Sequence, residues 1–212
     1  FAHPDDPLRP VEQRLRIAPH VGYVHLLVTK YRVVDDRSDY ASGAREPAMA
    51  LACPLHRRAR ALAFRQLEVF ANANLVAVVS ALPGEGKTFT CINLCLSIAR
   101  ERDWSVVLVD ADCSKPHLTR MFSAEDKPGL IDLLKDPSRT FDSLVMPTDV
   151  PGFSLLPAGS HDHHASELLA SRRMDELCAE LTGRAGRMVV FDSSPLLLTS
   201  EAPVLASKAG QV

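Results

Sequence analysis

Ser80-Ala81-Leu82-Pro83-Gly84-Glu85-Gly86-Lys87-Thr88 lies between an apolar run and a helical pattern, and this stretch decides the fold. The run before it, residues 75–79, reads Leu-Val-Ala-Val-Val, which predicts a buried strand. The glycines at 84 and 86 allow a tight turn that brings backbone N–H groups close to phosphate oxygens. The helix that follows directs the positive end of its dipole to the same place. The stretch therefore predicts a phosphate-binding loop, or P-loop.

Side chains of this loop extend the prediction from phosphate to Mg-ATP. Lys87 supplies a mobile positive charge for the β- and γ-phosphates, and the Thr88 hydroxyl is placed to bind Mg²⁺. The strict P-loop pattern has glycine where this chain has Ala81, so a variant P-loop subfamily is the better description. We assign nucleotide binding to Pro83, Gly84, Glu85, Gly86, Lys87, Thr88 and Phe89.

Two acidic stretches follow later strand-like runs. Val109-Asp110-Ala111-Asp112 ends one run, and Phe191-Asp192-Ser193-Ser194-Pro195 ends another. Asp110 and Asp112 are two residues apart, so at a strand end both can face the same side. Ligands of open α/β sheets bind beyond the carboxyl ends of the strands, where such carboxylates can hold a metal or accept a hydroxyl proton. A polar turn that caps a helix is the alternative for the first pair.

The rest of the chain alternates strand-like and helix-like patterns. Strands are expected at 106–109, 153–156 and 188–191, and helices at 86–100, 129–134, 165–181 and 200–207. This alternation predicts an α/β fold with a doubly wound, mostly parallel sheet. Residues 55–71 show apolar residues at helical spacing, which indicates an amphipathic helix that is either solvated or a docking surface. Residues 1–54 show no sustained period, and we expect an irregular or partly disordered segment there.

The composition argues against several functional classes. The net charge is −2, so no strong field points to nucleic acid as a partner. Five cysteines form no paired framework, which favours a reducing, cytosolic compartment. No apolar run approaches the roughly 18–20 residues that cross a bilayer, and no signal peptide is visible. The chain begins with Phe1 rather than Met, and we interpret it as a fragment or a processed product.

The P-loop and the two acidic stretches together resemble those of the bacterial tyrosine kinases, P-loop kinases that regulate polysaccharide export. The family's Pro-Gly-Glu-Gly-Lys loop, Asp-x-Asp pair and Asp-Ser/Thr-Pro-Pro stretch correspond to residues 83–87, 110–112 and 192–195. The segments that are most similar to the exosortase-associated branch of the family are 155–159, 165–171 and 199–207. The resemblance covers residues 55–212 and implies a kinase domain of the P-loop NTPase fold.

The chain also departs from the family pattern at defined positions. Lys115-Pro116 stands where Arg-Pro is usual, and Ser194 replaces the second proline of the last stretch. Ala63 replaces a glutamate of the helix signature that the family uses for subunit contact. The family's C-terminal strand or strands, helix and tyrosine cluster have no counterpart before Val212, which implies a C-terminally truncated domain.

The resemblance implies an ATP-dependent protein-tyrosine autokinase that regulates exopolysaccharide synthesis or export. Its catalytic residues would be Lys87, Asp110 and Asp112, with Asp110 as the base for the tyrosine hydroxyl. Mg²⁺ would be held by Thr88, Asp112 and Asp192. The implied partners are other copies of the chain and a membrane activator of chain length or export. The implied location is the cytoplasm, or the inner face of the membrane through that partner.

Two other functions remain open at this point. A deviant P-loop ATPase of the partitioning or septum-positioning type has the same fold, but its signature lysine lies near the start of the loop, where this chain has Leu82. A non-catalytic ATP-binding regulator agrees with Ser194 and with the expected truncation. Phosphotyrosine formed in the presence of Mg-ATP would separate the kinase from both.

Several further residues are given structural interpretations. His161-Asp162-His163-His164 is interpreted as a solvated loop rather than a metal tract. Cys91 and Cys95 are expected to be small buried thiols against the sheet rather than a redox pair. Trp104 is expected to pack, and His117 to cap a helix or face solvent rather than to contact phosphate.

Overall fold

The computed structural model describes residues 73–212. The expected irregular segment at 1–54 and amphipathic helix at 55–71 lie outside these residues. Within the described part, no helix combines the length and the apolar character needed to cross a membrane.

A five-stranded sheet forms the centre of the domain, in the order β1-β5-β2-β4-β3. All pairs are parallel except β3 with β4, which is antiparallel. The expected doubly wound, mostly parallel sheet is therefore confirmed. The strands are β1 (Leu75–Val78), β2 (Ser105–Ala111), β3 (Met146–Pro147), β4 (Phe153–Leu156) and β5 (Arg187–Ser193).

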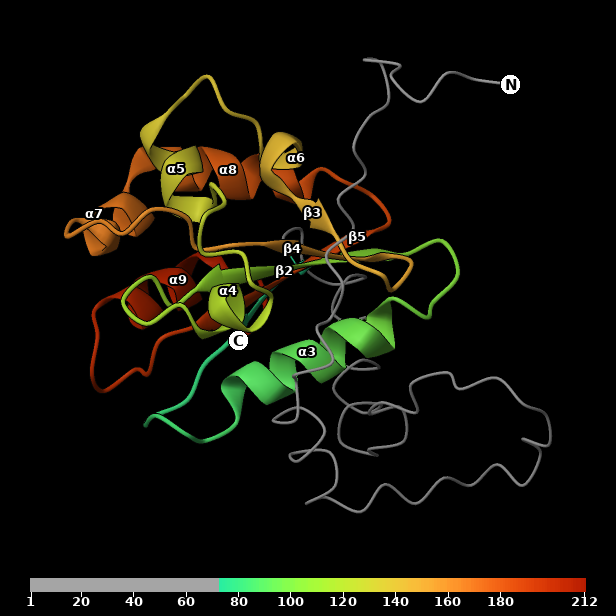
Figure 1. The fold of residues 1–212 in the computed structure, drawn as a ribbon, viewed down its shortest axis with the longest axis horizontal. Coiled ribbons are helices and arrows are strands. Elements are labelled where there is room, and N and C mark those ends of the chain that lie inside the picture. Colours follow the sequence, from blue (N-terminus) through green and yellow to red (C-terminus); the bar gives the residue numbers. More distant parts are fainter. Residues whose placement is uncertain (1–72) are drawn as a thin grey trace.

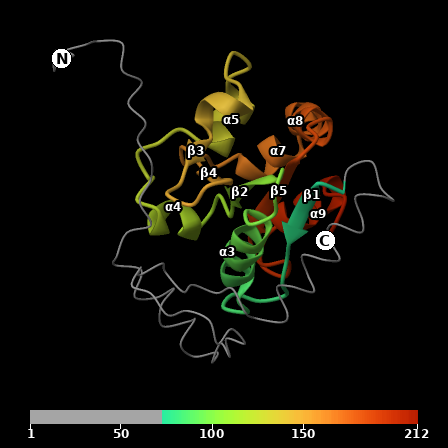
Figure 2. The same cartoon turned by 90° about the vertical axis from the view of Figure 1, so that its right-hand side faces the viewer.

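Helices cover both faces of the sheet (Figures 1 and 2). The side chains of α3 and α4 pack on one face, against alternate residues of β2 and β5, while α5 to α9 pack on the other. This alternation is the period of two that parallel strands buried on both faces require. The helices are α3 (Lys87–Ile98), α4 (His117–Met121), α5 (Leu130–Lys135), α6 (Phe141–Leu144), α7 (Ala165–Ala170), α8 (Arg172–Thr182) and α9 (Glu201–Lys208).

The helix expected over 165–181 is in fact two helices. Ser171 is extended, with φ −72° and ψ 159°, and ends α7. Its side-chain oxygen then accepts a hydrogen bond from the Met174 N–H at 3.4 Å and so caps the start of α8. Serine is a preferred N-cap because its oxygen satisfies an N–H that the helix leaves free. The expectation of one continuous helix was therefore wrong at this residue.

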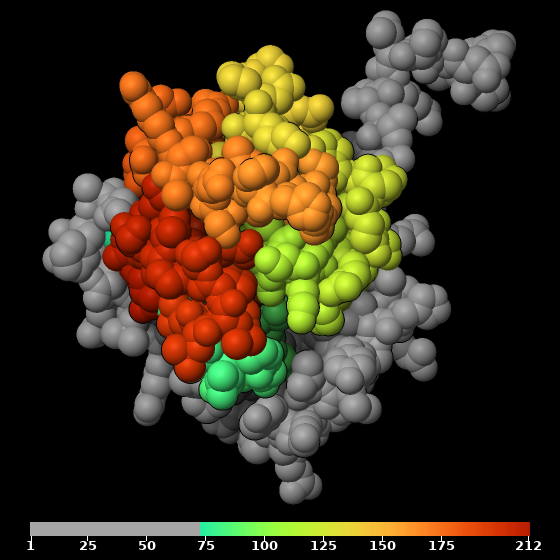
Figure 3. Space-filling view, turned by 90° about the vertical axis from the view of Figure 1, so that its left-hand side faces the viewer, coloured from blue at the N-terminus to red at the C-terminus, as the bar shows by residue number. Residues whose placement is uncertain are grey.

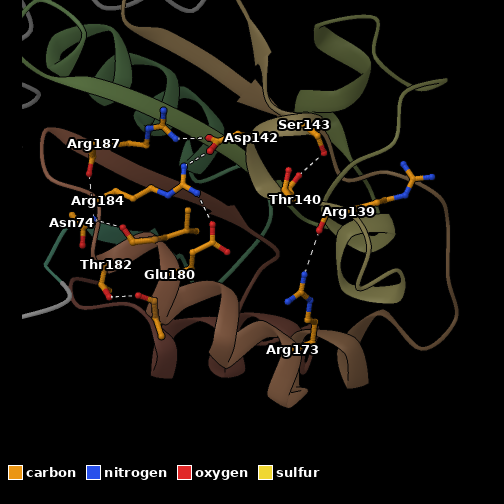
Figure 4. A network of polar contacts seen from close by, with 12 residues as sticks. Asn74, Arg139, Thr140, Asp142, Ser143, Arg173, Glu180, Thr182, Arg184 and Arg187 are labelled. Carbon is orange, nitrogen blue, oxygen red and sulfur yellow. Dashed lines mark hydrogen bonds and ion pairs between the residues drawn. The ribbon is translucent and has the colours of Figure 1, made fainter.

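Helix α8 is tied to α6 and to the start of β5 by charged side chains (Figure 4). Asp142 accepts from Arg187 at 2.7 Å and also pairs with Arg184, which reaches Glu180 on α8. These groups lie at the surface, so each pair contributes only about 0–1 kcal/mol. The network lies at the start of β5, at the opposite end of that strand from Asp192, and it joins α6 to α8.

The turn after β4 is held by close backbone contacts with the start of α5. The Leu130 N–H donates to Pro157 O at 2.8 Å, and Asp132 accepts from the Gly129 N–H and the Ser160 N–H at 2.9 and 3.0 Å. Gly159 has φ +87°, and a Cβ there would overlap the Asp132 carboxylate. Only glycine fits this position, and the turn is consequently fixed at the carboxyl edge of the sheet.

Candidate active site

The P-loop links β1 to α3 and is built on two left-handed glycines. Gly84 has φ 79° and Gly86 has φ 90°, a region that other residues rarely adopt. Glu85 accepts a hydrogen bond from the Leu82 N–H at 2.9 Å, which closes the turn, and this bond is the main cause that lowers the pKa of Glu85. The Lys87 ammonium donates to the Ser80 hydroxyl at 2.9 Å and so lies folded back over the loop.

Helix α3 begins at Lys87 without a side-chain cap. An uncapped helix start leaves backbone N–H groups and a positive partial charge directed outward. Residues 81–85 are exposed, so this end of the helix is open to an anionic ligand. Loop and helix together fit a nucleotide phosphate chain as the sequence predicts.

Asp192, near the end of β5, lies against the start of α3. Its two oxygens accept from different residues: the Thr88 hydroxyl at 2.6 Å and the Cys91 thiol at 3.5 Å. Burial raises the pKa of Asp192 to about 6, although Thr88, Cys91 and the nearby Lys87 act in the opposite direction. The carboxylate is therefore pre-aligned beside the hydroxyl that the P-loop pattern assigns to Mg²⁺.

Asp110, near the end of β2, is fully buried. One of its oxygens, Oδ2, accepts from both the backbone N–H and the hydroxyl of Thr119, each at 2.7 Å. Burial raises the pKa of Asp110 to about 7, against the effect of these two hydrogen bonds. Asp110 is thus an interior carboxyl that changes its charge close to neutral pH.

Asp112 is the more accessible carboxyl of the pair, half-buried just beyond β2. It accepts from the Lys115 N–H at 3.1 Å. Burial raises its pKa, and the positive charges of Lys87, Lys115 and Arg120 oppose that rise. Asp112 therefore lies within the electrostatic influence of the P-loop lysine.

Sheet register brings the three acids together. Asp110 is the direct partner of Asp192 across β2 and β5. Both residues lie on the sheet face that α3 covers, and Asp112 follows directly after the end of β2. After burial, the charges of Asp192 and Asp112 add to the rise in the pKa of Asp110, and Asp112 also raises the pKa of Asp192, as expected for neighbouring like charges. The acidic stretches and the P-loop predicted from sequence thus converge.

The donor set of this site fits Mg²⁺. It consists of hydroxyl and carboxylate oxygens, which are the ligands that this cation prefers. Thr88 and Asp192 are already in contact, at 2.6 Å. Among residues 73–212 there is no group of three or more His, Cys, Asp or Glu side chains arranged as a metal cage. Such a partial set agrees with the usual Mg²⁺ site, in which phosphates and waters complete the coordination.

The segment after β5 borders the P-loop. The Leu196 N–H donates to Ser80 O at 2.9 Å, and the Leu197 N–H donates to Ala81 O at 3.2 Å. Figure 3 shows the turquoise P-loop beside this red segment and beside the yellow-green segment that follows β2. Sequence reasoning missed this junction, because the pairing of distant loops follows only from the strand order.

Sequence reasoning also missed two buried polar residues beside the site. Glu201, at the start of α9, is buried and accepts from the Ser114 hydroxyl at 3.1 Å. Thr119 on α4 is buried against Asp110. Glu201 lies in the segment 199–207 that carries part of the family resemblance, but the sequence gives it no role, and Thr119 belongs to no recognisable motif. Only tertiary packing places the two residues near the acids.

The residues interpreted as structural take the places expected for them. His161, His163 and His164 are exposed, and Cys91 and Cys95 are buried free thiols on the sheet side of α3. Trp104 packs on the core beneath α3, and His117 is exposed at the start of α4. Cys113 and Cys178 are also buried and free, while Cys53 lies outside the described residues.

Comparison with known proteins assigns the family. The solved kinase domain of VpsO is 30% identical, with a TM-score of 0.61, and the similarity covers 74% of this chain and 77% of that domain. The chain belongs to the bacterial tyrosine kinase family. The chain is 37% identical to EpsB of Ralstonia solanacearum over 142 residues, or 67% of this chain. EpsB is named as a tyrosine-protein kinase. That region is 18% of EpsB, so the chain spans less than a fifth of this relative.

Other comparisons bear on the fold alone. The septum site-determining protein MinD of Pyrococcus horikoshii, solved with Mg-ADP, is 22% identical, with a TM-score of 0.50 over 64% of this chain and 54% of MinD. The P-loop kinases and the MinD-type ATPases therefore share this fold. No family model matches the chain. The narrower assignment to the exosortase-associated branch stays a prediction.

Proposed function

We propose that the chain is the catalytic domain of an ATP-dependent protein-tyrosine kinase that phosphorylates itself or another copy and regulates exopolysaccharide synthesis or export. The supporting observation is the convergence of the P-loop, Thr88, Asp192, Asp110 and Asp112 at one edge of the sheet. Membership in the family supports the reaction class. The cytoplasm, with a membrane activator as partner, remains the expected setting.

Each site residue has a distinct part in this proposal. Lys87 leaves Ser80 to bind the β- and γ-phosphates and stabilises the charge that develops during transfer. Thr88, Asp112 and Asp192 would hold Mg²⁺, which neutralises phosphate charge when it is bound. Asp110 orients or deprotonates the tyrosine hydroxyl.

Asp110 suits the role of base by its pKa of about 7, because a base works best when its pKa is near the operating pH. Because the carboxyl is buried without ligand, the side chains that cover Oδ1 have to move before a hydroxyl can reach it. Catalytic contacts commonly tighten only when substrate binds, so the ligand-free geometry is compatible with the role.

The test of the reaction is phosphotyrosine formation from Mg-ATP. The tyrosines of the chain are Tyr23, Tyr31 and Tyr40, all outside the described residues, so a copolymer of glutamate and tyrosine is added as acceptor. Phosphotyrosine in the wild type and its loss in Lys87→Ala are expected. Hydrolysis of ATP without phosphotyrosine would instead indicate an ATPase, and binding without turnover a regulator.

A second experiment tests the metal site without relying on turnover. Three carboxyl groups close together repel one another, and Mg²⁺ with nucleotide relieves this repulsion and stabilises the fold by mass action. We expect Mg-ADP to raise the melting temperature more than ADP with a chelator does. Asp112→Asn and Asp192→Asn should reduce this metal-dependent increment, whereas Asp110→Asn should keep it. An increment that persists in both of the first two variants would refute the metal assignment.

A further inference from the structure

Thr119 is a buried polar residue with no part in the P-loop or in the acidic stretches. It lies on the short helix α4, and 2% of its surface is exposed. Helix α4 covers the same sheet face as α3, and Thr119 contacts the end of β2 on that face. Its neighbour there is Asp110.

The contacts of Thr119 determine which oxygen of Asp110 is occupied. Its N–H and its hydroxyl both approach Oδ2, at 2.7 Å each. The other oxygen, Oδ1, is buried and has no hydrogen-bond partner among the described residues. A buried carboxylate oxygen without a donor is costly and uncommon away from functional sites. The carboxylate is thus held through one oxygen, and the other remains available.

The direction of the hydroxyl proton follows from a third contact. The Ala158 N–H donates to the Thr119 hydroxyl oxygen at 2.9 Å. Because an N–H can only donate, this contact uses a lone pair of the hydroxyl and leaves its proton for Asp110. Ala158 belongs to the rigid turn after β4, whose Pro157 carbonyl accepts from the Leu130 N–H. The orientation of Asp110 therefore depends on a hydroxyl that is itself anchored to a fixed turn.

We propose that Thr119 is a positioning residue for phosphoryl transfer, which holds Asp110 by Oδ2 so that Oδ1 is free for the acceptor hydroxyl. The inference rests on the proposed kinase function and adds to it a residue that never touches substrate. It predicts an effect on the transfer step rather than on nucleotide binding, since Thr119 acts through Asp110 alone.

The experiment compares Thr119→Val, which removes the hydroxyl at nearly constant volume, with Thr119→Ser, which keeps it. Thr148 offers a matched control. It is also a buried threonine, and its hydroxyl accepts from the Val150 N–H at 3.2 Å and donates to Phe153 O at 2.8 Å. Phe153 begins β4, whereas Ala158 follows the end of that strand, so Thr148→Val removes a similar hydrogen bond far from Asp110.

Initial rates of phosphotyrosine formation on the copolymer, and the Kd of Mg-ADP, are measured for each variant. Thr119→Val should lower kcat by about tenfold or more, within the range of lost general-base catalysis, with KM for ATP and the Kd of Mg-ADP nearly unchanged. Thr119→Ser should recover most of kcat, and Thr148→Val should behave as wild type. In an Asp110→Asn background, Thr119→Val should have no further effect, because both changes remove the same contribution.

Other outcomes overturn the inference. An unchanged kcat in Thr119→Val, no recovery in Thr119→Ser, or an additive loss in the Asp110→Asn background would show that Thr119 does not act through Asp110. Loss of Mg-ADP binding in Thr119→Val would assign Thr119 to the fold of the nucleotide site instead. A wild type that binds Mg-ADP but forms no phosphotyrosine would refute the proposed function itself, and the role of Thr119 with it.

Discussion

Replacing Asp110 by asparagine should change how the stability of the nucleotide-free protein depends on pH. The pKa of Asp110 is raised from 3.8 to about 7, chiefly by burial. A carboxyl whose pKa is higher in the folded protein contributes stability that is fully present below the unfolded pKa and is lost as pH rises through the folded value. At about 1.4 kcal/mol per pKa unit, the contribution of Asp110 should fall by about 4 kcal/mol between pH 4 and pH 8.

The asparagine of the Asp110→Asn variant cannot ionise, so the free energy of unfolding of the variant should not show this fall with rising pH. Its amide oxygen can still accept both hydrogen bonds from Thr119, but its NH₂ would replace Oδ1, which has no partner among the described residues. The unsatisfied NH₂ costs about 1–3 kcal/mol, and this cost does not vary with pH. The variant should therefore be close to or below wild type at pH 4 and about 1–3 kcal/mol more stable at pH 8.

The assay is urea unfolding of both proteins, without nucleotide or metal, at several pH values from 4 to 8. The decisive quantity is the difference between the two free energies of unfolding as pH rises, because the constant amide cost cancels from its slope. Asp126→Asn, at an exposed carboxyl, is the control and should leave the pH dependence as in wild type. A difference between Asp110→Asn and wild type that stays flat from pH 4 to pH 8 would refute the account of a buried carboxyl.

Three further predictions concern single residues. Lys87→Ala should lower phosphate transfer by about 100-fold or more, with little change in melting temperature, because the proposed contacts of this lysine are with ligand; turnover near the wild-type rate would contradict the proposed role. Gly159→Ala should lower the free energy of unfolding in urea by roughly 2 kcal/mol or more, since φ is +87° and Asp132 occupies the space of a Cβ. Gly183→Ala is the control and should be nearly neutral, because a Cβ there would lie 3.7 Å from the Glu180 carbonyl oxygen. Ser171→Ala should cost about 1 kcal/mol by removing the cap of α8, and an unchanged midpoint would mean that the two helices are separated by another cause.

Much of the fold could be predicted because its signals are local and long enough. The runs that became β1, β2 and β5 are apolar over several residues and end in glycine-rich or acidic stretches, which few other structures produce. Helices α4 and α6 have only 5 and 4 residues, too few for a helical period to be recognised, and they were missed. Ser171 was missed because a single capping residue within an apolar pattern is a weak signal beside its neighbours.

The candidate site likewise contains residues that the sequence predicts and residues that it does not. Lys87, Thr88 and the three acids could be named from the sequence because each lies at a strand end or in a patterned loop. Thr119 could not, because its contact with Asp110 depends on how α4 folds back over β2, and a lone threonine carries no pattern. The burial of Asp110 was equally inaccessible to sequence reasoning, since it depends on which segments cover the end of the strand.

The position of β5 between β1 and β2 determines when the site can exist during folding. Strand β1 and the P-loop are made first, then β2, yet the strand that separates them begins only at Arg187. Until β5 enters that gap, β1 lacks its neighbour on this side, and Asp192 cannot meet Thr88. Such long-range pairing makes folding slow, because a large loop must close before the contacts form. Binding of nucleotide with metal should therefore report that the sheet has been completed, and a nascent chain that has emerged only as far as α8 should carry the P-loop without a working site.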